Sequence, residues 1–180
     1  MKIETATIRR LRDALLQSGR RPSSVLSPSY ETLTRLGMLS AQEAAALDRV
    51  DPLAETMYLM MSADGRITEE ERDAVRGAIR GLTGDVLNAG TIQVMLEKYA
   101  ERAQQMGRNQ RLQEVGKAVA NSPTEAEGAF ALAAAVALAD DQVAPEETAL
   151  MNALARWFRI SEERAAEILD QLDEDRHSVR

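Results

Sequence analysis

Helix-start signals recur along this chain of 180 residues, and they constrain its fold more than any other feature. Thr68 is followed three residues later by Glu71, the capping-box pattern in which each side chain satisfies a backbone N–H at the start of a helix. The same signal recurs at Ser40 and, with a proline at the first helical position, at Ser122. No segment shows strand-like alternation bounded by turns. The chain is therefore predicted to be all-α, a bundle of about eight or nine helices joined by short loops.

Proline residues and local composition mark the boundaries of the predicted helices and domains. Because proline suits the first turn of a helix, Asp51-Pro52 is expected to begin a new helix after one that ends at Val50. Residues 1–37 contain one amphipathic helix and a Gly-, Pro- and Ser-rich segment, which predicts an N-terminal helical extension and tether. Residues 38–175 are predicted to form the main helical domain.

Charge and cysteine content exclude several classes of protein. The formal net charge is −7, which argues against nucleic-acid binding, because phosphate contact needs a basic surface. The chain has no cysteine, which excludes disulfides and is typical of a cytoplasmic protein. The longest nearly apolar run, residues 128–139, is shorter than the ~18 residues that span a bilayer, so no membrane insertion is expected.

An internal repeat becomes visible when the chain is compared with itself at an offset of 76 positions. The stretch ADGRITEEERDAVRGAIRGL, residues 63–82, aligns with ADDQVAPEETALMNALARWF, residues 139–158. Each copy follows an apolar helix and has an aspartate-led turn, an aliphatic residue and a glutamate pair. The pattern predicts two helix-turn-helix repeats that bury their apolar faces against each other.

This twice-repeated motif resembles the TerB-like, or tellurite-resistance, family of helical domains. The first copy carries it on Asp64, Gly65, Ile67, Glu70 and Glu71, and the second on Asp140, Val143, Glu146 and Glu147. The second copy departs from the pattern, since Asp141 replaces the usual glycine. The resemblance covers roughly residues 38–172. It implies a bundle of paired helices with a role in metal binding or the stress response, and no established enzymatic activity.

The acidic residues of the two copies are the candidate binding site. Calcium and magnesium prefer oxygen ligands, so Asp64, Glu71, Asp140 and Glu147 could share one divalent cation if the repeats bring them to one face. A purely structural interpretation is the stronger alternative. Glu71 and Glu147 can cap their own helices, and the two aspartates can simply form turns.

Three functional hypotheses follow. The first is a non-enzymatic domain of the stress response that binds a divalent cation, calcium or magnesium. The second is a protein-interaction or co-chaperone-type module without a metal site, whose extension docks a protein partner or mediates self-association. The third, a metal-dependent hydrolase, has the least support. The single histidine, His177, lies in a charged tail and gives little support to a catalytic triad.

Overall fold

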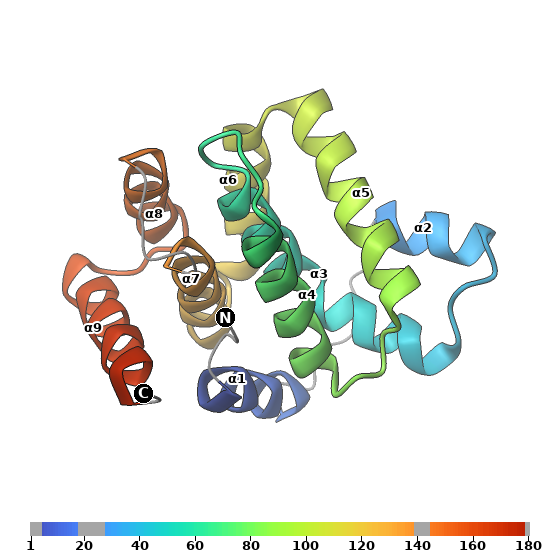
Figure 1. The fold of residues 1–180 in the computed structure, drawn as a ribbon, viewed down its shortest axis with the longest axis horizontal. Helices are drawn as coiled ribbons and strands as arrows, with labels where there is room; N and C mark the ends of the chain where they lie inside the picture. The colour runs from blue at the N-terminus through green and yellow to red at the C-terminus, as the bar shows by residue number, and fades with distance from the viewer. Residues whose placement is uncertain (1–4, 18–27, 139–144, 179–180) are drawn as a thin grey trace.

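The computed structural model describes residues 5–17, 28–138 and 145–178, and this part of the chain contains nine helices and no strand (Figure 1). The all-α prediction is confirmed. In order, the helices are α1 (Thr5–Gln17), α2 (Pro28–Arg35), α3 (Ala41–Met61), α4 (Glu69–Thr83), α5 (Ala89–Met106), α6 (Arg108–Val119), α7 (Pro123–Ala137), α8 (Pro145–Trp157) and α9 (Glu162–Ser178).

Helix α3 lies at the centre of the bundle. It packs against α2, α4, α5, α6 and, most extensively, α7. Helices α8 and α9 lie to one side of α7, and α2 and α5 lie at the opposite end of the molecule (Figure 1). The sequence explains this arrangement, because the second half of α3 and most of α7 are mainly apolar on every side, with Glu55 the charged exception, as expected of helices surrounded by others.

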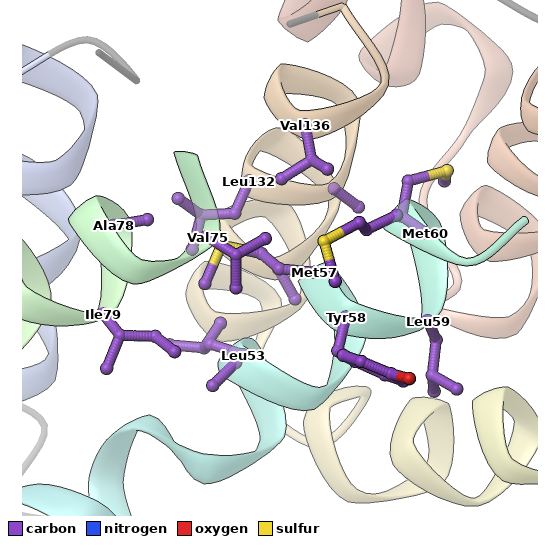
Figure 2. Close-up of a cluster of buried hydrophobic side chains, with 14 of the residues drawn as sticks. Leu53, Met57, Tyr58, Leu59, Met60, Val75, Ala78, Ile79, Leu132 and Val136 are labelled. Carbon is purple, nitrogen blue, oxygen red and sulfur yellow. The ribbon is translucent and has the colours of Figure 1, made fainter. Parts of the chain in front are cut away.

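The core is formed where α3, α4 and α7 meet (Figure 2). The methionines Met57 and Met60 are fully buried there, consistent with the use of flexible thioether side chains to fill irregular space. Around them lie side chains of all three helices: Leu53, Tyr58, Leu59, Val75, Ala78, Ile79, Leu132 and Val136.

The predicted break before Pro52 is wrong. Residues 41–61 form one continuous helix with Pro52 in its interior. A proline there removes one backbone hydrogen bond and costs ~3 kcal/mol or more. Both halves of the helix, however, bury apolar side chains in the same core, including Leu47 before the proline and Leu53 after it. Shared burial outweighs the local signal for a helix start.

The helix starts predicted at Ser40, Thr68 and Ser122 are confirmed. Ser40 and Thr68 each form both hydrogen bonds of a capping box, and the Ser122 hydroxyl accepts a hydrogen bond from the backbone N–H of Glu125. Helix α4 ends at Gly84, whose φ of 61° lies in the left-handed region that favours glycine. These local interactions set the ends of the helices that carry the first acidic turn.

Candidate functional site

The first acidic turn joins α3 to α4, and Asp64 organises it. The Asp64 side chain is exposed, and its Oδ1 accepts a hydrogen bond of 2.8 Å from the backbone N–H of Arg66. Gly65 has a φ of 81°, a conformation that residues with side chains rarely adopt. Arg108 donates to the carbonyl oxygens of Ser62 and Ala63 at 2.6 Å, which holds the end of α3 from the side of α6.

Glu71 has the structural role that its spacing predicted. Its Oε2 accepts hydrogen bonds from the backbone N–H of Thr68 at 2.7 Å and from the Thr68 hydroxyl at 2.8 Å. The Thr68 hydroxyl in turn accepts from the Glu71 backbone N–H. The Glu71 side chain is buried, at 5% exposed. The capping box engages one of its two carboxylate oxygens.

The second acidic turn is described only in part. Asp140 falls in residues 139–144, outside the described residues, whereas Glu147 lies buried in the first turn of α8 and has an interaction partner. Among the residues that the structure describes, no three His, Cys, Asp or Glu side chains are grouped so that they could hold a metal ion. A shared cation site therefore stays a prediction that depends on Asp140.

A second polar cluster, which the sequence analysis did not predict, lies buried between α3, α5 and α6. Glu55 of α3 is 1% exposed and accepts from Arg111 Nε at 2.5 Å and Nη2 at 2.8 Å. Arg102 of α5 donates to the same carboxylate at 3.1 Å. Such two-point charged pairs are geometrically specific, so this cluster fixes α5 and α6 against the central helix.

Asp51, one turn before Glu55, extends the cluster. The Tyr99 hydroxyl donates to Asp51 Oδ1 at 2.7 Å. Burial raises the pKa of Asp51 to about 6, and the nearby charge of Glu55 acts in the same direction. Burial and the adjacent Asp51 carboxylate together raise the pKa of Tyr99 well above its usual value. Tyr99 thus remains a neutral donor at all physiological pH values.

The buried cluster is better suited to structure than to catalysis. Both carboxylate oxygens of Glu55 are taken by guanidinium groups, and the Asp51 carboxylate is held by Tyr99. A perturbed pKa often marks an active site, but there it accompanies a group that can reach a substrate. Here the acids face helix-borne partners inside the bundle.

Comparison with known proteins assigns this chain to a family. The family model described as Tellurite resistance protein TerB matches residues 50–170, about two-thirds of the chain. The chain belongs to the TerB family. No curated protein and no solved structure matches it significantly.

The TerB match spans the elements that carry both candidate sites. It starts at the middle of α3 and ends within α9, so it includes both acidic turns and the buried Glu55 cluster. Helices α1 and α2 precede it. The proposed boundary between an extension at 1–37 and a domain at 38–175 is close to this division and stays a prediction.

The TerB chain also lacks, among its described helices, any segment long and apolar enough to cross a bilayer. Helix α7, the most apolar, is interrupted by Glu125 in its first turn and is 15 residues long. It packs most extensively against α3.

The sequence did contain one signal for the buried cluster. Asp51 and Glu55 are two acids four residues apart in the otherwise apolar stretch that leads to Met61. Residues at this spacing lie on the same face of a helix. Two acids on a buried face need cationic partners, but nothing in the sequence indicates that Arg102 and Arg111 supply them.

Proposed function

We propose that this TerB-family protein is a non-enzymatic domain of the stress response that binds a divalent cation, calcium or magnesium. Asp64 and Asp140 would be the principal ligands, with Glu71 and Glu147 contributing from the adjacent helices. The observation that carries the proposal is the packing of α3 against α7, because each of these helices leads directly into one of the acidic turns.

The internal repeat supports this arrangement. Met60 of α3 and Val136 of α7 occupy equivalent repeat positions, 76 residues apart, and both belong to the cluster in Figure 2. Asp64 and Asp140 each follow four residues later in the sequence. The packing of α3 against α7 therefore supports a shared site for the two aspartates.

The hydrogen bonds of the first turn leave ligand atoms available. Asp64 is exposed and uses Oδ1 for the turn, which leaves Oδ2 for a cation. Glu71 uses Oε2 for the capping box and is 5% exposed, so it would reach a cation only through Oε1. A hard cation prefers such carboxylate oxygens, and its charge would offset the repulsion between acids gathered at one point.

Thermal unfolding with added metal tests the proposal. An ion that binds only the native state stabilises it, by about 2.7 kcal/mol at a concentration one hundred times its Kd. Calcium, magnesium or manganese should therefore raise the Tm relative to EDTA. The increase should be lost in Asp64→Asn and in Asp140→Asn.

Glu70→Gln is the matched control. It removes one negative charge from the same turn of α4, at an exposed side chain next to Glu71. If the ion is held by the aspartates, this variant keeps the metal-dependent increase in Tm. The absence of any shift at millimolar metal, or an equal loss of the shift in Glu70→Gln, would remove the cation site.

A further inference from the structure

Two glycines inside helices allow α1 to pack closely against the surface of the domain. A Cβ at Gly81 of α4 would lie 2.8 Å from Ile8 Cγ2, and a Cβ at Gly128 of α7 would lie 2.0 Å from Leu11 Cδ2. Neither glycine has a positive φ, so no backbone conformation requires it. Since glycine weakens a helix interior, the close approach of α1 is the feature that uses these positions.

Gly81 and Gly128 thus mark a groove between α4 and α7 that accepts a helix. Both of these helices lie inside the TerB match, whereas α1 precedes it. The anchors on α1 are Ile8 and Leu11, three residues apart on one face and 7% and 8% exposed. The groove belongs to the family domain, and its present occupant comes from the N-terminal extension.

Helix α1 leaves a hollow on each side of this groove, one lined by α3 and α4 and one by α7 and α9. Leu16 is 57% exposed and stands at the edge of a hollow of about 220 Å³, whose apolar wall includes Val50 and Leu82. A second hollow of about 180 Å³ lies along the other side of α1, towards α9. A helix with larger side chains at these edges would bury more apolar surface than α1 does.

Charge adds a second element of recognition. Residues 1–27 contain six basic and two acidic residues, and the remainder of the chain contains 16 basic and 27 acidic residues. Arg9 and Arg10 are exposed on the outer face of α1. The net negative charge of the domain acts at long range and steers helices with a basic outer face towards the groove.

We propose that the groove between α4 and α7 docks an amphipathic helix of another protein, and that α1 occupies it as an intramolecular competitor. The partner helix has two aliphatic anchors three residues apart, a basic outer face, and a larger side chain for the hollow beside Leu16. In docking of this kind, an apolar groove recognises the apolar face of the bound helix. The proposal does not depend on the cation site.

An engineered disulfide can hold α1 in place. A Cβ at Gly81 would lie 3.9 Å from the Cβ of Ile8, within the range of about 3.5–4.5 Å found in disulfides. The chain has no cysteine, so Ile8→Cys with Gly81→Cys introduces a single pair. Oxidation links α1 covalently to α4 and so holds α1 in the groove. Reduction allows α1 to leave the groove. Failure of the pair to oxidise would show that α1 does not dock there and would overturn the proposal.

The probes are fluorescent peptides with the sequence of residues 1–17, each carrying Ile8→Ala to make room for the side chain that Gly81→Cys introduces. Their binding to the full chain is measured by fluorescence anisotropy. One peptide also carries Leu16→Trp, a second is otherwise unmodified and is called the unmodified peptide, and a third also carries Arg9→Glu with Arg10→Glu. The Leu16→Trp peptide should bind the reduced double variant at least tenfold more tightly than the oxidised one. It should also bind more tightly than the unmodified peptide, and the charge-reversed peptide should bind at least tenfold more weakly than the unmodified one.

The wild-type chain, which lacks cysteine, should bind each peptide equally with and without reductant. Equal affinity of the oxidised and reduced double variant would overturn the proposal, as would no binding to either form. If the unmodified peptide binds as tightly as the Leu16→Trp peptide, the groove prefers α1 itself. That result would also overturn the proposal, because the exchange partner would then be a second copy of this chain.

Discussion

Glu55 and Arg111 form a two-point ion pair that joins α3 to α6, with N–O distances of 2.5 and 2.8 Å. The Glu55 side chain is 1% exposed, whereas that of Arg111 is 17% exposed. The carboxylate is thus the fully buried member of the pair, and it also receives Arg102. The pair connects the central helix to the hairpin of α5 and α6, so its integrity should be measurable as global stability.

Glu55→Gln should destabilise the protein by about 3 kcal/mol, within the range of roughly 3–5 kcal/mol observed when a buried ion pair loses one partner. The reason is that Arg102 loses its carboxylate partner in a largely buried setting, while Arg111 keeps only its ion pair with Glu114 at 2.6 Å. Urea unfolding measures the change. Glu101→Gln is the control, since Glu101 is exposed and pairs with Lys98, and it should cost less than about 1 kcal/mol. Equal effects would show that burial of Glu55 has no energetic consequence.

Asp51 should make stability fall as the pH rises from about 4 to 7. Its pKa in the folded state is about 6, against an ordinary value of 3.8, so the native state holds the proton more tightly than the unfolded state. Stability is therefore present in full below pH 3.8 and is lost as the pH rises through 6. The interval between the two pKa values corresponds to roughly 3 kcal/mol.

Comparison with Asp51→Asn isolates this contribution, because asparagine keeps an acceptor for Tyr99 and does not titrate. The unfolding free energy of the wild type minus that of the variant should decrease between pH 4 and pH 7, with all other groups cancelling. A flat difference, or one that increases with pH, would show that Asp51 is not a carboxyl with a raised pKa.

Glu71→Gln should separate capping from cation binding. Glutamine can also occupy the third position of a capping box, so this variant should lose less than about 0.5 kcal/mol in EDTA. Glu71→Ala should lose about 1 kcal/mol, because the Thr68 N–H then has no acceptor at a half-buried helix start. If metal raises the Tm of the wild type but not of Glu71→Gln, the glutamate has both roles. A large loss in Glu71→Gln without metal would contradict the capping assignment.

Gly128→Ala should displace α1, since the added Cβ would stand 2.0 Å from Leu11 Cδ2. Trypsin should then cleave after Arg9, Arg10 and Arg12 several-fold faster than in the wild type.

Gly77→Ala is the matched control for Gly128→Ala: Gly77 is also inside a helix, but nothing lies within 4 Å of its Cβ position. That variant should be more stable by about 0.5–1 kcal/mol, with unchanged cleavage. Unchanged cleavage in Gly128→Ala would mean that Leu11 adjusts without release of α1.

Local chemistry explains which parts of the fold could be predicted. The capping boxes at Ser40 and Thr68 act within four residues of chain, so their residue types alone predicted the helix starts. The left-handed end of α4 at Gly84 is local in the same way, because glycine is favoured there for its conformational freedom. The break predicted at Pro52 failed for the opposite reason, since the packing that overrides it comes from α4 and α7.

The sequence by itself determined the all-α class, the capped helix starts and the resemblance to the TerB family, because spacing and capping are properties of neighbouring residues. Only the tertiary structure decided that Asp51 and Glu55 meet Tyr99, Arg102 and Arg111 across about 50 residues of chain. It also decided that Gly81 and Gly128 face α1. Such contacts depend on which helix surfaces face each other, and this follows from burial of the whole apolar surface rather than from any local pattern.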